Sequence, residues 1–166
     1  MEPARSPDAL DDDDLNRAAT TRSGHNVSRH ALQVVEYALS APTPRRQRTW
    51  VHRLTIAVNA LADAIDQQIA DNDHSIGLLA EIALTQPEHS DAVIDLRNEQ
   101  RALRIAIASV REQLDEHPEL PIDTTDIRQR LAHVAQQYRQ HNTREAELIH
   151  TTLGIDITEP PQPPLS

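Results

Sequence analysis

The sequence predicts an all-α protein, folded as an up-down-up-down antiparallel bundle of four long helices. Composition favours helices over sheets, because the chain has only 3 Gly and no Phe and is rich in Ala, Leu, Ile, Arg, Glu and Gln. Periodicity agrees, since apolar residues recur at alternating steps of three and four over long stretches. The 166 residues suit one domain with a core of its own.

Both ends of the chain are expected to lie outside this bundle. Residues 1–22 include the run Asp11 to Asp14 and little apolar sequence, so we expect a disordered acidic tail there. Residues 158–166 include EPPQPPLS, and such prolines end a helix and favour extended backbone. The bundle domain is therefore predicted to span residues 23–157.

Each predicted helix ends at a recognisable break. Prolines in APTPRR, TQP and HPELP interrupt the periodic stretches, because proline lacks the N–H that a helix interior needs. The last helix is expected to begin at the capping residues Asp123 to Thr125 and to close at Gly154. Short links favour antiparallel neighbours. The predicted stretches, of which the third is only one or two turns, are about Ser23–Leu39, Arg45–Asp71, Leu78–Leu84, Glu88–Glu116 and Thr124–Thr152.

The buried face of the first helix is assigned by the same periodicity. Val27, Val34 and Ala38 recur at helical steps, with His30 or Ala31 between them. We therefore expect Val27 and Val34 to lie in the core, and His30 to lie within one step of the apolar seam.

A polar side chain interrupts the seam of every long helix. Gln100 stands where the third helix would be expected to carry a leucine, and Gln68 lies on the seam of the second. His141 and Glu145 lie one turn apart on one face of the fourth helix, and His30 is the candidate on the first. Burying an unpaired amide or imidazole costs roughly 1–3 kcal/mol, so we expect these side chains to meet in one polar layer.

Three segments carry a resemblance to a known family. They are DQQIADNDHSIGLLAEI (residues 66–82), LRNEQRALRIAI (96–107) and RQHNTREAELIHTTLGIDI (139–157). Through them the chain from about His30 to Ile157 resembles a hemerythrin-like (HHE cation-binding) domain, a helical bundle that holds two irons with His and carboxylates. Such donor sets suit non-haem iron. The resemblance therefore implies a hemerythrin-like bundle.

The resemblance also implies that two metal-ligand positions have changed. Gln68 stands at the His of the second helix, with Asp73 as the nearby acid, and Gln100 stands at the His of the third helix. An amide is a poor transition-metal ligand because it is neutral and weakly basic, although it can still hydrogen bond. We therefore expect a degenerate site without a cofactor; the alternative is iron, as one ion or two.

The family pattern leaves several candidate ligands, vestigial or working. On the fourth helix His141 is retained, and its carboxylate is either Glu145 or Glu147. Tyr138, one turn before His141, could donate its hydroxyl to the layer, and His74 could supplement the site from the DNDHSIG break. The structural alternatives are a core tyrosine and an exposed loop histidine. The complete set of candidate metal ligands is His30, Asp73, His141, Glu145 and Glu147.

Charge and missing motifs exclude several function classes. The formal charge of -10, with Arg as the only strongly basic residue type, argues against binding to nucleic acid or to an anionic membrane. The chain lacks Cys, a signal-peptide core and any run of ~20 apolar residues, so we expect a cytoplasmic protein. A Gly-rich phosphate loop and a G-x-S-x-G turn are also missing.

These observations predict a non-catalytic binding or accessory protein that acts through contacts with another protein or with itself. The resemblance implies an alternative, a working non-haem iron protein that binds oxygen or handles peroxide or nitric oxide. A third hypothesis is a regulator whose histidines titrate near neutral pH and change its assembly.

Overall fold

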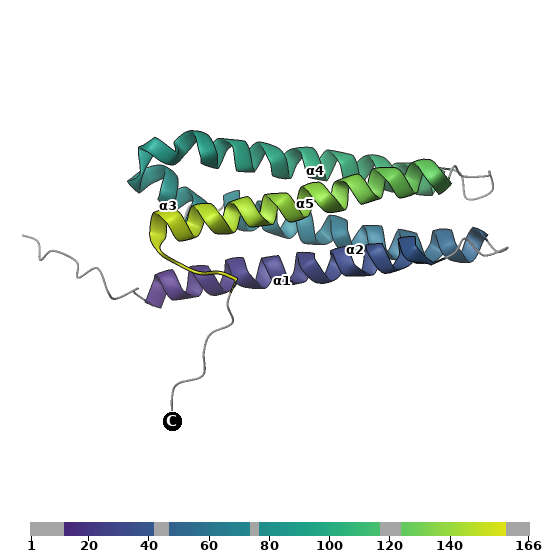
Figure 1. Cartoon of the computed structure of the whole chain (residues 1–166), viewed down its shortest axis with the longest axis horizontal. Helices are drawn as coiled ribbons and strands as arrows, with labels where there is room; N and C mark the ends of the chain where they lie inside the picture. Colours follow the sequence, from purple (N-terminus) through teal and green to yellow (C-terminus); the bar gives the residue numbers. More distant parts are fainter. Residues whose placement is uncertain (1–11, 42–46, 74–76, 117–123, 159–166) are drawn as a thin grey trace, which may run out of the picture.

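The computed structural model describes residues 12–41, 47–73, 77–116 and 124–158, and these ranges contain helices and no strands. Figure 1 shows the long helices α1, α2, α4 and α5 side by side, with the short α3 at one end. The predicted all-α class is confirmed. The helices are α1 (Asp12–Ser40), α2 (Gln47–Asp73), α3 (Leu78–Thr85), the 3-10 turn η1 (Pro87–His89), α4 (Ser90–Glu116) and α5 (Thr124–Leu153).

The start of α1 differs from the prediction. Residues 12–22 were expected in a disordered acidic tail, but α1 begins at Asp12 and its first turn contains Asp12, Asp13 and Asp14. Carboxylates in the first turn are favourable because they face the positive end of the helix dipole. In addition, Arg17 pairs with Asp14 and lies 2.8 Å from Glu81 of α3. The rest of the predicted tails, residues 1–11 and 159–166, lies outside the described residues.

The two ends of the bundle are joined by contacts between α1 and α5. Near the start of α1, Arg22 donates to the carbonyl of Asp156, which follows the end of α5, at 2.9 Å. Near the start of α5, Arg128 donates to the carbonyls of Leu39 and Ala41 at the end of α1, the latter at 3.0 Å. The two helices therefore run in opposite directions, and α2 and α4 complete the ring of packed neighbours.

The apolar core consists of two clusters. The larger cluster lies among α1, α2, α4 and α5 and includes Leu32, Leu54, Leu61, Ile107 and Leu131. The smaller cluster lies at the end that α3 covers and includes Leu79, Ile82, Val93, Ile149 and Ile155. On α5 the break between them falls after Tyr138 and before Ile149, where His141 and Glu145 are buried.

The predicted buried face of α1 is wrong at Val27 and Val34, although Ala31 is buried and Ala38 packs against the core as predicted. Val27 and Val34 are 55% and 38% exposed, whereas Leu32 and Val35 are fully buried. The helix has apolar residues on adjacent faces, so periodicity alone allowed two assignments one residue apart. Packing against α2 and α5 selects the face that carries His25, Ser28, Leu32 and Val35.

The end of α5 confirms the predicted cap. Gly154 has φ of 69°, the left-handed conformation that glycine adopts without a Cβ penalty. Its N–H donates to the carbonyl of His150 at 2.9 Å, which satisfies a carbonyl of the last turn. The cap redirects the chain so that Ile155 and Ile157 are buried in the smaller cluster.

Replacing Gly154 with alanine is expected to lower the free energy of unfolding by about 1 kcal/mol, because the new Cβ strains the left-handed backbone although the space around it is open. The matched control is Gly24→Ala inside α1, where the Cβ would make an ordinary 3.5 Å contact with Gln68. Alanine there should raise stability by about 0.5–1 kcal/mol. Urea unfolding of both variants measures the difference, and a shift of the same sign in both would contradict the cap.

Candidate functional site

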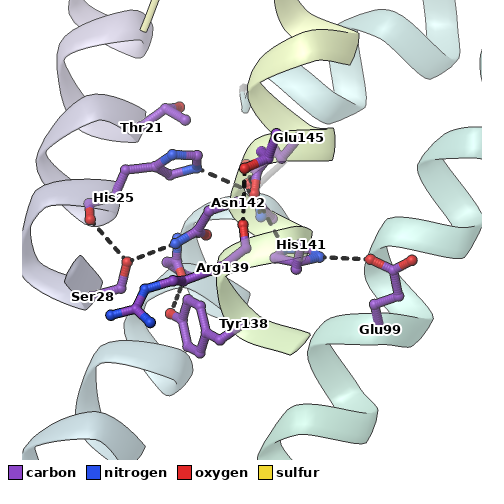
Figure 2. A network of polar contacts seen from close by, with 12 residues as sticks. Thr21, His25, Ser28, Glu99, Tyr138, Arg139, His141, Asn142 and Glu145 are labelled. Carbon is purple, nitrogen blue, oxygen red and sulfur yellow. Dashed lines mark hydrogen bonds and ion pairs between the residues drawn. The ribbon is translucent and has the colours of Figure 1, made fainter. Parts of the chain in front are cut away.

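A layer of buried polar side chains separates the two apolar clusters, and all four long helices contribute to it. We call this set the polar layer; its central members appear in Figure 2. Apolar periodicity predicts that polar side chains of α2, α4 and α5 are buried at one depth. The side chains concerned are all buried: Gln68, Gln100, His141 and Glu145. The members of the polar layer are His25, Ser28, Gln68, Asn72, Gln100, His141 and Glu145.

Glu145 lies at the centre of the polar layer, between two imidazoles. Its Oε2 is 3.3 Å from Nε2 of His141, which lies one turn earlier on the same face of α5. The same Oε2 is 3.5 Å from Nε2 of His25, which points across from α1 (Figure 2). Its Oε1 accepts from the amide of Asn72 on α2 at 3.5 Å. Three helices therefore converge on one carboxylate.

A second carboxylate orients His141 from the other side. Nδ1 of His141 lies 3.0 Å from Oε2 of Glu99 on α4. The other oxygen of Glu99 lies 3.0 Å from the guanidinium of Arg144. Because one ring nitrogen is engaged by Glu99, the other, Nε2, is directed toward Glu145.

The amide of Gln68 is satisfied by protein partners. Its oxygen accepts from the hydroxyl of Tyr138, and its nitrogen donates to Asn142 at 3.3 Å. Asn142 in turn donates to the hydroxyl of Ser28 at 3.1 Å, and Ser28 donates to the carbonyl of His25 at 2.9 Å. This chain of hydrogen bonds connects α2, α5 and α1 beside the imidazoles.

Tyr138→Phe is expected to lower the free energy of unfolding by about 1–2 kcal/mol, because it removes the hydroxyl and leaves the buried oxygen of Gln68 without that donor. Tyr37→Phe, on the exposed face of α1, is the control and should change stability by less than about 0.5 kcal/mol. Chemical denaturation gives both values. Equal stability of the two variants would contradict the hydrogen bond between Tyr138 and Gln68.

Several buried atoms of the polar layer have no hydrogen-bond partner. They are Nε2 of His25, Nε2 of Gln100, Nε2 of His141 and Oε2 of Glu145. The imidazoles approach Glu145 at ion-pair distances, but without hydrogen-bond alignment. An unsatisfied buried polar atom costs roughly 1–3 kcal/mol, and native proteins contain few of them. Their gathering in one layer therefore points to a functional site.

The surroundings of Glu145 and His141 also change the pKa of each. Burial raises the pKa of Glu145, but the close approach of the His141 and His25 imidazoles outweighs it and lowers this pKa to about 2. Burial lowers the pKa of His141, but Glu145 and Glu99 outweigh it and raise this pKa above 6.5. The polar layer therefore keeps Glu145 ionised and favours protonated His141.

Three predicted site residues lie outside the polar layer. His30 is exposed on α1, and the imidazole that α1 contributes is His25. Asp73 is exposed at the end of α2, and its neighbour Asn72 contacts Glu145 instead. Glu147 is exposed on α5, because it lies two residues after Glu145 and so faces away from the core. The remaining candidate, His74, lies outside the described residues.

Sequence reasoning missed three members of the polar layer and one supporting carboxylate. Asn72 could have been found, since it follows Gln68 by the same four residues that separate Glu145 from His141. His25 and Ser28 share the face of Leu32, but the wrong face of α1 had been chosen. Glu99 gave no signal, because it precedes Gln100 by one residue and appears solvent-facing in the pattern.

No protein-family model, curated protein or solved structure matches this chain. The hemerythrin-like assignment therefore remains a prediction carried by the residues themselves. In the described ranges, no helix combines the length and apolarity that a membrane span requires. Within the same ranges, no group of three or more His, Cys, Asp or Glu side chains is placed so that it could hold a metal ion.

Proposed function

We propose that this protein is a hemerythrin-like, up-down-up-down antiparallel bundle whose two-iron centre has given way to a hydrogen-bonded polar layer. It acts as a non-catalytic binding or accessory protein through contacts with another protein or with a second copy of itself. The observation that carries the proposal is that Gln68, at an implied ligand position, is engaged by Tyr138 and Asn142.

The composition of the polar layer supports the loss of a two-ion centre. On α2 the pair Gln68 and Asn72 has the spacing that His141 and Glu145 have on α5, so neutral amides stand where an imidazole and a carboxylate would serve a metal. Glu145 is the one carboxylate among the polar-layer residues described above. A single anion and two imidazoles offer too little charge and too few donors for two divalent ions.

Exposed apolar side chains support a role in protein contacts. Val27, Val34 and Tyr37 lie at helical spacing on the outer surface of α1, and Tyr37 is 79% exposed. Ile56 on the neighbouring α2 is 57% exposed. Large apolar side chains that share an outward helix surface favour association with another protein.

Two measurements test the proposal. Elemental analysis of protein purified from iron-supplemented cells should find fewer than two irons per chain. A photo-crosslinking residue at Val34 should trap a discrete partner or a second copy, whereas the same residue at Gln129, on the exposed face of α5, should not. Two irons per chain with oxo-to-iron absorption bands would overturn the proposal in favour of the oxygen-binding alternative. Failure to crosslink at Val34 together with a strictly monomeric mass would overturn the binding role.

A further inference from the structure

We propose that the outer face of α1 and α2 binds a second copy of this chain, in a two-fold symmetric dimer in which each helix packs antiparallel to its counterpart. The inference rests on the contact role in the proposed function and deepens it, because it names the partner and the contacts. We call this surface the paired face. It consists of Val27, His30, Val34 and Tyr37 on α1 and of Arg53, Ile56, Ala60, Asp63 and Gln67 on α2.

The two halves of the paired face form one continuous surface. Along each helix its residues recur at steps of three and four, so each set shares one side of its helix, and every member is exposed. The helices α1 and α2 are packed neighbours. Val27 from the first set and Gln67 from the second line the same hollow between these helices. The two sets therefore lie side by side and face the same way.

A contact between α1 and α2 shows which of their residues lie at the same level along the bundle. A Cβ at Gly24 would lie 3.5 Å from Cγ of Gln68. The two helices run antiparallel, because the end of α1 accepts a hydrogen bond from the start of α2. Moving the same number of residues forward along α1 and back along α2 leads to Val34 and Val58. These two residues therefore lie at about one level.

The charges of the paired face are opposite on the two sides of this level. Arg53 and Asp63 lie equally far from Val58, in opposite directions along α2. Both are exposed, and neither has an ion-pair partner among the residues that the structure describes. A two-fold axis at this level, perpendicular to the helices, reverses the direction of α2 in the second copy. Arg53 of each copy then faces Asp63 of the other, so that the ion pair forms twice.

The apolar residues occupy the centre of the same pattern. Val34 lies at the level of the axis and therefore faces Val34 of the other copy. Ile56 and Ala60 are equally far from the axis, so a large side chain meets a small one on each side of it. His30 and Tyr37 lie on opposite sides of Val34, where the two rings of different copies can stack. Apolar contacts at the centre with ion pairs at the edge are typical of protein interfaces.

The paired face is also large enough for a stable dimer. Two neighbouring helices, each about 40 Å long and about 10 Å wide, present roughly 800 Å² of surface, which is the area per partner in an interface of standard size. An unrelated partner would not require opposite charges at equal distances from one level. The arrangement of Arg53 and Asp63 therefore favours a second copy over a different protein.

Charge reversal in the full chain tests the pairing. Arg53→Glu and Asp63→Arg each place like charges opposite one another twice, so each variant alone should weaken dimerisation by more than about 100-fold. An equimolar mixture of the two variants should form a heterodimer, because every introduced charge then meets an opposite one. Sedimentation equilibrium measures all three samples. Glu147→Arg, at an exposed position of α5, is the matched control and should leave the dimer unchanged.

Val34 provides an independent test at the centre of the paired face. Val34→Asp should weaken dimerisation by more than about 10-fold, whereas Ile105→Asp, at an exposed apolar position of α4, should leave it unchanged. The chain has no Cys, so Val34→Cys introduces a single thiol. Mild oxidation should link two copies through this thiol, because the two Val34 positions face each other, and should not link them through Ile105→Cys.

Several results would overturn the dimer. They are a wild-type chain that stays monomeric at high micromolar concentration, a dimer that survives either charge reversal, a mixture of the two variants that stays monomeric, and equal oxidation yields at Val34 and Ile105. A monomeric chain that crosslinks a different protein through Val34 would overturn this inference alone. Two irons per chain would overturn the proposed function and leave the dimer in place.

Discussion

Glu145→Leu is expected to lower the free energy of unfolding by about 3–5 kcal/mol, the cost of removing one partner from a buried charged cluster. The substitution removes the carboxylate that lies beside the His25 and His141 imidazoles and accepts the hydrogen bond of Asn72. His141 then remains in the core without the Glu145 charge that favours its protonated form. A leucine of similar size fills the space, so the expected loss comes from electrostatics and hydrogen bonding and not from a cavity.

The matched control for this substitution is Glu147→Leu. Glu147 lies on the same helix and is exposed, so its replacement should change stability by less than about 0.5 kcal/mol. Urea unfolding followed by circular dichroism measures both variants. A Glu145→Leu variant as stable as the wild type would show that the two imidazoles do not lie close to Glu145 in solution.

The stability of the protein is expected to be highest between about pH 4.5 and pH 6.5 and to fall on both sides. The pKa of Glu145 is lowered from 4.5 to about 2, so its contribution is complete above pH 4.5 and is lost as pH falls toward 2. That contribution is about 3 kcal/mol, since one pKa unit corresponds to about 1.4 kcal/mol. The pKa of His141 is raised above 6.5, so its contribution is complete below pH 6.5 and is lost as pH rises through the folded-state pKa.

Denaturation at a series of pH values tests the two branches separately. His141→Gln should flatten the alkaline branch, because it removes the imidazole whose pKa is raised. His133→Gln, at an exposed position on α5, should leave both branches in place. A wild-type stability that keeps rising between pH 6.5 and pH 8 would contradict the direction of the His141 shift.

Much of the fold could be predicted from local signals. Proline breaks and apolar periodicity gave α2, α4 and α5 to within a few residues, because strong local patterns and tertiary packing agree there. The start of α1 was missed because Asp12 to Asp14 were judged by composition alone. Their charges are favourable in the first turn of a helix, but composition does not predict that helix. Its buried face, which includes Ala18, is defined only by packing against the rest of the bundle.

The candidate site was predictable where a polar residue interrupts an unambiguous seam. Gln68, Gln100, His141 and Glu145 meet that condition, and each is buried as expected. His25 does not, because α1 has apolar residues on two adjacent faces and a shift of one residue exchanges the buried imidazole for an exposed one. Glu99 contacts His141 from a partly exposed position at the edge of the core. Apolar periodicity does not predict which partly exposed side chains contact a buried one.

Because the buried polar side chains of the four long helices lie at one level along the bundle, they also specify how the helices align along their common axis. Apolar contacts tolerate axial slip, since one leucine replaces another when a helix slides by a turn. Here a slide of α5 by one turn would bring His141 and Glu145 against apolar side chains of the neighbouring helices, such as Leu96 or Leu103 of α4, and leave their charges unpaired. The polar layer thus acts as a register mark, and the molecule gives up some stability for a single alignment.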